Sequence, residues 1–301
     1  MHLGVTIPQR EIPLDVPALR DFAQAAESMG YDHVMTGDHV LGASVANRPD
    51  WRGPYTNEDL WHEPFVLFGY LAGLTNTIEL VSSILVLPQR QTALVAKQAA
   101  QVDVLSGGRM RLGIGVGWNH VEFEALGESF TNRGRRSEEQ MEVMHALWTQ
   151  EVVTYEGRWH KIDAAGLNPM PVQRPIPIWI GGGPNSVLNA ESVESDPVLR
   201  RIARRADGWF PSIGPVEECA IAIETLHGYM REYGRDPSEV GIQGRVAYPG
   251  DGPEGWLREA RAWLTAGATH ITARTVGAGL ATVDEHIEAM AQVREALDDL
   301  F

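Results

Sequence analysis

Residues 78–118, IELVSSILVLPQRQTALVAKQAAQVDVLSGGRMRLGIGVGW, decide the fold. The apolar run 78–88 predicts a strand that is buried on both faces, as strands of parallel sheets usually are. Residues 92–105 have helical periodicity and lead to a Gly-Gly pair, and glycine commonly ends a helix. Residues 109–117 predict a second strand. Strand, helix and strand in this order form the repeating unit of a parallel sheet.

The same alternation continues on both sides of this unit. Strands are predicted at residues 3–8, 31–40, 78–88, 109–117, 176–183, 208–212, 240–249 and 270–274. Helices are predicted at residues 16–29, 64–74, 92–105, 133–148, 196–205, 217–233, 254–266 and 283–297, with a long loop at 41–61 and a hairpin at 154–163. About eight such units predict an α/β fold, a (β/α)8 TIM barrel with loop insertions at the C-terminal ends of its strands.

The bulk composition fits one globular domain spanning residues 1–301. Barrels of this kind run to roughly 250 residues as a single domain, and the 44% apolar share can fill a core. The net charge of -15 repels phosphate backbones and anionic membrane surfaces. We therefore expect a small-molecule substrate as the partner, with neither nucleic acid nor a membrane.

The N-terminal segment and the cysteine content indicate a cytoplasmic protein. Residues 1–15 carry charges and prolines, unlike a signal peptide, and no apolar run reaches the roughly 20 residues that cross a bilayer. Cys219 is the only cysteine, so no intramolecular disulfide can form. No metal site is predicted, because neither the His62-Glu63 pair nor the His120-x-Glu122 pair has further ligands at suitable spacing.

Glycine-rich strand ends carry most of the functional signal. GIGVGW at residues 113–118 resembles a dinucleotide-binding fingerprint, but its glycines have the wrong spacing and no helix signature follows at once. Alternatively, Gly113 and Gly115 are small so that the strand can pack inside a tight barrel. Gly181, Gly182 and Gly183 directly follow a strand and predict a phosphate-binding turn, because free backbone N–H groups can meet an anion there. A plain turn is the alternative.

Asp38 and His39 follow the second strand, where barrel enzymes place their chemistry. An imidazole can exchange a proton near neutral pH, and a carboxylate can accept a hydrogen bond from a ligand hydroxyl. Without further context, the two side chains could equally be hydrogen-bonded within the loop and have no catalytic role. Aromatic residues in the predicted strand-end loops, Trp51, Tyr55, Trp61, Trp118 and Trp159, could line a pocket for a planar ligand or simply pack the loops.

Taken in order, TGDHV at 36–40, the stretch 82–127, RPIPIWIGGGP at 174–184 and ADGWFP at 206–211 resemble the luciferase-like oxidoreductases, which use flavin mononucleotide (FMN) or the deazaflavin coenzyme F420. The resemblance covers roughly residues 3–215. Its SGGR, RLGIGVGW and EFEALG motifs are most similar to the F420-dependent members. Such proteins usually form homodimers, so the resemblance implies a homodimer here.

The resemblance also implies roles for individual residues. Asp38 and His39 correspond to the pair at the deazaflavin, where the histidine would exchange the proton that accompanies hydride transfer at C5. The step from Ser83 to Ile84 corresponds to a cis peptide bond that backs the ring. Val116 and Gly117 correspond to backbone lying along the ring or tail, and Gly181, Gly182 and Gly183 to the turn that contacts phosphate.

Two departures limit what the resemblance implies. Trp118 replaces the acidic base of the sugar-phosphate dehydrogenases, so that activity is not expected. Residues 185–196 lengthen the connection after the glycine turn, either to cap the cofactor, to contact a second subunit or as a solvated loop. The expected function is an F420-dependent hydride transfer to or from a small organic substrate, with Trp51, Tyr55, Trp61 and Trp118 lining its pocket. An FMN-dependent monooxygenase and a non-catalytic flavin-binding carrier are the alternatives.

Overall fold

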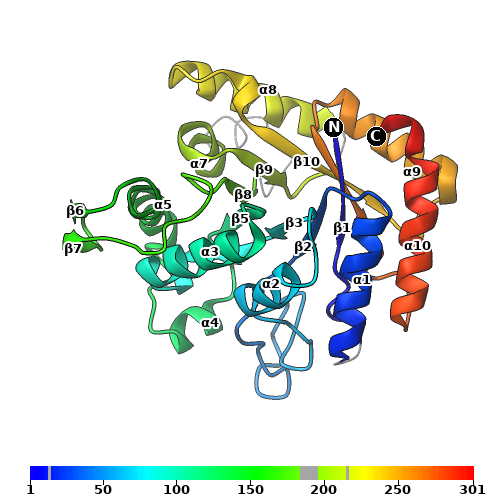
Figure 1. Cartoon of the computed structure of the whole chain (residues 1–301), viewed down its shortest axis with the longest axis horizontal. Helices are drawn as coiled ribbons and strands as arrows, with labels where there is room; N and C mark the ends of the chain where they lie inside the picture. Colours follow the sequence, from blue (N-terminus) through cyan, green and yellow to red (C-terminus); the bar gives the residue numbers. More distant parts are fainter. Residues whose placement is uncertain (13–14, 184–195, 215–216) are drawn as a thin grey trace.

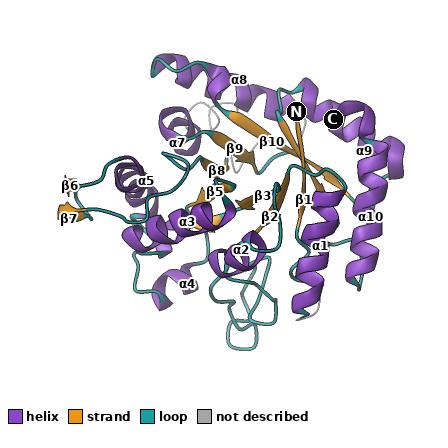
Figure 2. Ribbon diagram, viewed as in Figure 1, coloured by secondary structure: helices purple, strands orange, loops and turns teal. Residues whose placement is uncertain are grey.

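The computed structural model describes residues 1–12, 15–183, 196–214 and 217–301. Within them, parallel strands form a closed ring with helices around its outside (Figures 1 and 2). The ring contains β1 (His2–Thr6), β2 (His33–Thr36), β3 (Glu79–Ser82), β4 (Leu85–Val86), β5 (Met110–Gly115), β8 (Ile178–Gly182), β9 (Gly208–Pro211), β10 (Gly241–Ala247) and β11 (His270–Arg274). The predicted (β/α)8 barrel is confirmed.

The ring closes through β3, which pairs with both β2 and β5. Leu80 lies opposite Val34 on one side and opposite Met110 on the other. The single strand predicted over residues 78–88 is interrupted, and its second half, β4, pairs with β5 nearer the C-terminal mouth. Between the two halves, the peptide bond from Ser83 to Ile84 is cis, as predicted.

The helices cover the outer face of the ring. They are α1 (Val16–Ser28), α2 (Pro64–Ala72), α3 (Thr92–Ser106), α5 (Arg133–Thr149), α7 (Pro197–Arg205), α8 (Glu217–Glu232), α9 (Gly252–Thr265) and α10 (Val283–Ala296). Their apolar faces pack on the strands in one large core. A second, smaller cluster of Met35, Val81, Trp179 and Phe210 fills the inside of the barrel. The sequence predicted each of these helices to within a few residues of its observed bounds.

Three segments do not belong to the ring or its outer helices. The predicted hairpin is present as β6 (Val153–Glu156) and β7 (Lys161–Ala165), which project to one side of the molecule (Figure 1). Residues 37–63 form a long loop without helix or strand, as expected. A short helix, α4 (His120–Ala125), was not predicted. Its only sequence signal is the Asn119-x-x-Glu122 pattern typical of a helix start, and the apolar stretch that follows is too short to show helical periodicity.

The strand glycines are required by packing within the chain. A Cβ atom at Gly113 would lie 1.9 Å from the Ser82 carbonyl oxygen, and one at Gly115 would lie 2.6 Å from Cδ1 of Ile84. Glycine at these positions therefore lets β5 close against β3 and lets Ile84 enter the barrel. The packing alternative for these two residues is confirmed, and the closed ring excludes the Rossmann fold to which the fingerprint belongs.

The sequence predicts no membrane span, and the length and polarity of the helices can be compared with that prediction. In the described ranges, no helix is both long enough and apolar enough to cross a membrane.

Candidate active site

A cavity of about 310 Å³ opens at the C-terminal ends of the strands. Its lining comes from most sides of the ring and from the loop before α2. The described lining residues are Thr6, Ile7, Gln9, Arg10, Met35, Gly37, Trp61, Ser83, Phe210, Pro211, Gln243, Gly244, Arg245, Trp263, Thr272, Arg274 and Val276. This is the position at which TIM-barrel enzymes carry their active sites.

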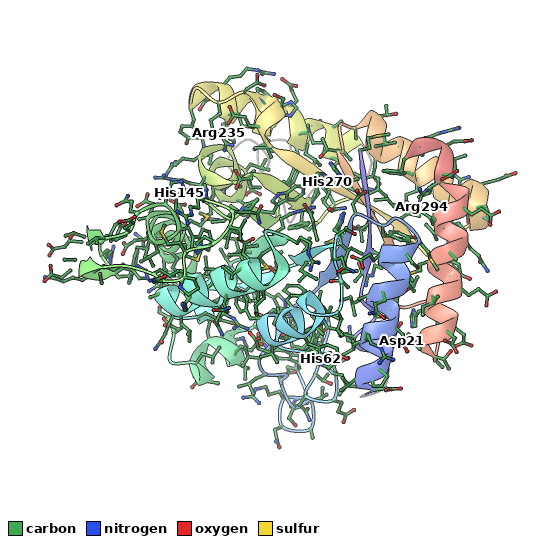
Figure 3. All side chains as sticks on the ribbon, in the orientation of Figure 1. Asp21, His62, His145, Arg235, His270 and Arg294 are labelled. Atoms are coloured by element: carbon green, nitrogen blue, oxygen red, sulfur yellow. The ribbon has the colours of Figure 1, made fainter. Side chains whose placement is uncertain are left out.

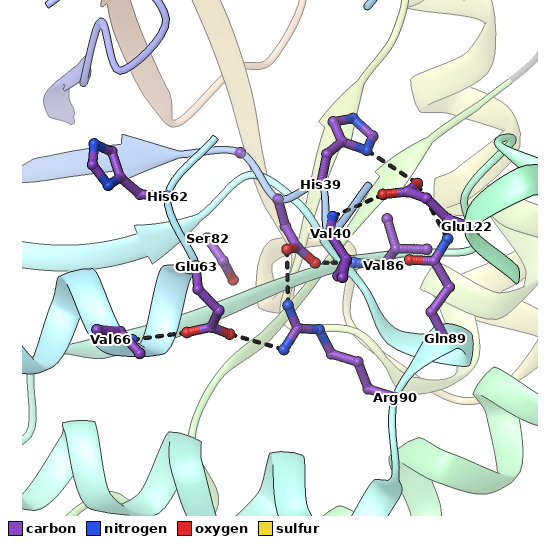
Figure 4. Close-up of polar contacts among 12 residues, drawn as sticks. His39, Val40, His62, Glu63, Val66, Ser82, Val86, Gln89, Arg90 and Glu122 are labelled. Carbon is purple, nitrogen blue, oxygen red and sulfur yellow. Dashed lines mark hydrogen bonds and ion pairs between the residues drawn. The ribbon is translucent and has the colours of Figure 1, made fainter. Parts of the chain in front are cut away.

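His39 lies just beyond this cavity, on the segment that leaves β2. Its Nδ1 atom lies 3.3 Å from Oε2 of Glu122 on α4, as Figure 4 shows. The imidazole is 16% exposed, whereas the Glu122 side chain is fully buried. The ring of His39 also stacks on Tyr55, with 3.6 Å between their centroids. His39 is therefore held on two sides by the protein.

Glu122 was given no role from the sequence, although it begins the EFEALG motif and stands in the rejected His120-x-Glu122 metal pattern. Its Oε1 accepts hydrogen bonds from the backbone N–H groups of Val40 at 2.8 Å and Leu41 at 3.1 Å. Its Oε2 accepts one from the Tyr55 hydroxyl at 2.9 Å. Burial opposes ionisation, but the bonds from His39, Leu41 and Tyr55 outweigh it and lower the pKa of Glu122. Glu122 is thus a buried carboxylate at neutral pH.

The charge of Glu122 determines the tautomer of His39. A carboxylate without a proton can only accept, so Nδ1 of His39 must be the nitrogen that carries hydrogen in this contact. The other nitrogen, Nε2, is then the one that can take up or release a proton. This is the arrangement by which a buried carboxylate orients a histidine in many acid–base sites.

Four aromatic residues form a connected group beside His39, and we call them the aromatic wall: Trp51, Tyr55, Trp61 and Trp118. The rings of Tyr55, Trp61 and Trp118 lie next to His39, whereas Trp51 lies next to Trp118. Their neighbouring rings lie between 5.2 and 5.7 Å apart, centroid to centroid. Trp61 lines the main cavity, and Trp118 is 40% exposed. The predicted pocket residues are therefore brought together, although their contact with a substrate stays a prediction. Trp159 lies apart, in the hairpin, where its N–H donates to Glu139 of α5.

Asp38 has both carboxylate oxygens engaged within the chain. Oδ1 accepts from Arg90 Nη2 at 2.8 Å, and Oδ2 accepts from the Val86 N–H at 3.2 Å. Burial raises the pKa of Asp38, while Arg90 and the Val86 N–H oppose that rise. Arg90 also donates to Glu63 at 2.8 Å, so it joins the end of β2 to the start of α2 (Figure 4). Asp38 positions the loop that carries His39, and its contact with a cofactor stays a prediction.

The other predicted cofactor residues lie around the same mouth of the barrel. Ser83 lines the cavity, and the side chain of Ile84 fills the space left by Gly115 and Gly181. Val116 and Gly117 continue β5 toward α4. Gly117 has a φ of 70° and leaves no room for a Cβ, which would lie 2.5 Å from Val86.

The glycine turn at the end of β8 has a backbone that only glycine adopts readily. Gly181 and Gly182 are the last two residues of β8, paired with Phe210 and Pro211 of β9, so only Gly183 follows the strand as predicted. Gly182 and Gly183 have φ angles of 128° and 143°. The Gly182 carbonyl accepts a hydrogen bond from the Trp209 indole at 2.8 Å, which fixes the turn. The predicted insertion at 185–196 lies outside the described residues except for Asp196, whose carboxylate caps α7 by accepting from the Val198 N–H.

These residues fit a flat tricyclic cofactor. The buried Trp61 indole N–H, at the cavity edge, has no hydrogen-bond partner within the described part of the chain. It can therefore donate to a ring carbonyl group. The glycine turn at Gly182 and Gly183 offers close backbone approach for a phosphate-bearing tail.

Histidines occur on several sides of the molecule, as His62, His145 and His270 show in Figure 3. His270 stacks on His2, with 4.5 Å between the ring centroids, and its ring lies 6.0 Å from that of His33. Across residues 1–12, 15–183, 196–214 and 217–301, no group of three or more His, Cys, Asp or Glu side chains is arranged to hold a metal ion.

Comparison with known proteins agrees with this geometry. Residues 1–299 match the protein family described as luciferase-like monooxygenase. An uncharacterized protein of Mycobacterium tuberculosis is 33% identical over 241 residues, which are 78% of this chain and 80% of that protein. The FMNH(2)-dependent dimethylsulfone monooxygenase of Pseudomonas putida is 30% identical over 186 residues, which are 60% of this chain and 48% of that enzyme.

Among solved structures, an F420-dependent secondary alcohol dehydrogenase in complex with an F420–acetone adduct is similar over 98% of both chains. The TM-score is 0.77 and the sequence identity is 18%. At that identity the similarity establishes the fold alone.

Proposed function

Because the chain belongs to the luciferase-like monooxygenase family, we propose that it is an F420-dependent oxidoreductase acting on a small organic substrate. The observation that carries the proposal is His39, held by the buried Glu122 carboxylate at 3.3 Å beside a cavity at the barrel mouth. One histidine with a defined tautomer is what a hydride transfer coupled to a single proton requires. The similar F420-dependent alcohol dehydrogenase and the motif resemblance support the choice of cofactor.

The chain would hold the cofactor from two sides. When bound, the deazaflavin supplies hydride transfer at its C5 position. Trp61 would donate its indole N–H to the ring system, and Ser83 and Ile84 would lie behind it. The N–H groups of the turn at Gly182 and Gly183 would bind the phosphate of the tail.

His39 would exchange the proton with the substrate. Glu122 holds hydrogen on Nδ1, so Nε2 accepts a proton when the substrate is oxidised and releases it when the substrate is reduced. The aromatic wall beside His39 would limit the access of water to this transfer, since it leaves only 16% of the imidazole exposed, and would thereby strengthen the polar contacts inside the site.

An FMN-dependent monooxygenase is the second candidate. It is favoured by the 30% identity to the FMNH(2)-dependent dimethylsulfone monooxygenase. The same cavity and aromatic wall would serve that reaction, because it also needs a site from which water is excluded. The two candidates differ in cofactor and in oxygen consumption.

The test is a comparison of both reduced cofactors. The protein is titrated without oxygen with reduced F420 and with reduced FMN, and binding is followed by fluorescence. A panel of ketones, enones and imines is then supplied, while cofactor oxidation and oxygen uptake are recorded. Tight binding of reduced F420 and substrate-dependent oxidation without oxygen uptake are expected. Preferred FMN binding with oxygen uptake would replace the proposal by the monooxygenase. Cofactor binding without turnover on any substrate would favour a carrier.

A cytoplasmic homodimer is part of the proposal. Large apolar side chains on neighbouring helices α2 and α3 are exposed, with Val66 73% and Leu94 52% accessible. Exposed apolar side chains on two adjacent helices favour contact with a second copy. Light scattering after gel filtration is expected to give twice the 33.1 kDa chain mass.

A further inference from the structure

The cavity has a charge opposite to that of the whole chain. The protein carries 40 acidic and 25 basic residues. Yet the described lining residues of the cavity include Arg10, Arg245 and Arg274 and no aspartate or glutamate. Arg10 forms an ion pair with Asp59 and lies over the Trp61 ring, so its charge is partly matched. The positive charge without an acidic partner among the described residues belongs to Arg245 on β10 and Arg274 on β11.

Arg245 and Arg274 face the inside of the barrel. Two residues before Arg245, Gln243 donates from Nε2 to Oγ1 of Thr272 at 2.7 Å, and both of these side chains line the cavity. Side chains on a strand alternate between its two faces, so Arg245 and Arg274 follow Gln243 and Thr272 on the inner face. The strand register, which aligns Arg245 with Thr272, places the two guanidinium groups on adjacent strands nearer the mouth.

Within the part of the chain that the structure describes, neither guanidinium group contacts a polar partner. Among the described residues, Arg245 and Arg274 make no side-chain hydrogen bond and no ion pair, and both are exposed. Arg90 and Arg111, by contrast, are buried with carboxylate partners. An unpaired arginine pair at a cavity mouth is a site for an anionic oxygen group, which guanidinium binds through two parallel hydrogen bonds.

A second, independent feature of the same wall also indicates a ligand. Gln243 is only 6% exposed, and its Oε1 atom has no partner in the ranges that the structure describes. A buried polar atom without a partner is costly, and a ligand hydroxyl or N–H group would satisfy it. The apolar lining residues Ile7, Met35 and Phe210 lie between the polar groups and can contact a hydrocarbon body.

We propose that the substrate is a small organic anion, a carboxylate or a phosphate ester, whose charged group binds Arg245 and Arg274. This inference rests on the proposed function, since it names the substrate class of the same site. In the ring order, β10 lies across the barrel from β3, so the anion would bind opposite Ser83. The substrate would then extend from the two arginines toward His39, and the arginines would fix its orientation.

The test measures anion binding without a cofactor. Benzoate, phenyl phosphate and the neutral benzamide are titrated calorimetrically into the native protein and into Arg245→Gln and Arg274→Gln. Arg261→Gln, on the outside of α9, removes the same charge away from the cavity and is the control. Melting temperatures establish that each variant is folded. Each cavity substitution is expected to weaken anion binding about tenfold or more, since a hydrogen bond to a charged group has about that effect.

The expected result is that at least one anion binds at least about tenfold more tightly than benzamide, with the control variant unchanged. The tighter of benzoate and phenyl phosphate identifies the anionic group. Equal binding of benzamide and the anions, or anion affinities that neither cavity substitution changes, would overturn the proposal. Weaker binding of reduced F420 with unchanged benzoate binding would assign the arginines to the cofactor instead. Failure of the protein to bind reduced F420 would contradict the proposed function but would leave this anion test intact.

Discussion

Nδ1 of His39 lies 3.3 Å from Oε2 of Glu122, although 83 residues separate them in the chain. The contact joins the segment after β2 to the short helix after β5. It is reinforced by the backbone N–H groups of Val40 and Leu41, which donate to the same carboxylate. The position of His39 therefore depends on a fully buried negative charge.

His39→Ala tests the proposed proton exchange. Loss of a positioned acid–base group typically lowers kcat by about 10²- to 10⁴-fold. We expect a loss in that range, with reduced cofactor binding changed much less, because the proposed cofactor contacts come from Trp61 and the glycine turn. Steady-state kinetics and fluorescence titration measure the two quantities. His145→Ala, on the exposed face of α5, is the matched control. Unchanged turnover in His39→Ala would remove His39 from the mechanism.

Glu122→Gln tests the positioning role of the carboxylate while keeping its shape. The amide can still accept from the Val40 N–H, but its NH2 group would face the Tyr55 hydroxyl and His39 Nδ1. Mispairing of a buried polar group costs about 1–3 kcal/mol, so chemical denaturation should show a loss in that range. Glu124→Gln, on the exposed side of the same helix, should leave stability unchanged.

A purely structural role would lower the stability of Glu122→Gln without changing kcat of the folded variant. If Glu122 orients His39, kcat of the folded variant must also fall, while binding of the reduced cofactor changes little, because the proposed cofactor contacts come from Trp61 and the glycine turn. An unchanged kcat would restrict Glu122 to a structural role.

The stability difference between the native protein and Glu122→Gln should itself depend on pH. The pKa of Glu122 is lowered below its ordinary value of 4.5 in the folded protein. A lowered acid pKa contributes stability above the unfolded-state pKa, and that contribution is lost as pH falls through the folded-state pKa. Urea denaturation at a series of pH values from 7 to about 3 should show the difference narrowing below about 4.5. A constant difference across that series would contradict the assigned charge.

Local patterns in the sequence predicted the barrel and named part of the candidate site. Strand and helix patterns are short-range, so the bounds of α1 and α3 could be predicted closely. Asp38 and His39 were singled out because they follow a strand end. Glu122 begins the EFEALG motif but was given no role, because its partners are loop atoms about 80 residues earlier, which the motif does not reveal.

Two further features also depended on the three-dimensional structure. Arg245 and Arg274 were not singled out, because only the closed ring brings β10 and β11 to the cavity. Conversely, Trp159 has the same loop signature as Trp118, yet it lies in the hairpin, where its backbone N–H donates to Glu139 of α5. Whether such a residue lies at the cavity depends on its neighbours across the barrel, and a single sequence does not show these neighbours.

The contact between Gly115 and Ile84 provides a test of the packing behind the proposed cofactor site. A Cβ atom at Gly115 would lie 2.6 Å from Cδ1 of Ile84. Gly115→Ala should therefore destabilise the protein by about 1–3 kcal/mol through overpacking. Ile84→Val, which removes Cδ1, should cost about 0.5–1.5 kcal/mol alone. In the double variant the shortest contact is removed, while Cγ1 of residue 84 remains 3.0 Å from the added Cβ atom, so the total loss should be smaller than the sum of the two.

Gly69→Ala is the control for this cycle. Gly69 lies within α2, and a Cβ atom there would meet nothing within 4 Å. Alanine in a helix interior is favoured over glycine by about 0.5–1 kcal/mol, so this variant should be slightly stabilised. Strictly additive losses for Gly115→Ala and Ile84→Val would mean that Ile84 does not occupy the space beside β5. The proposed support of the cofactor ring by Ile84 would then be lost, because that support requires the side chain to be fixed in this space.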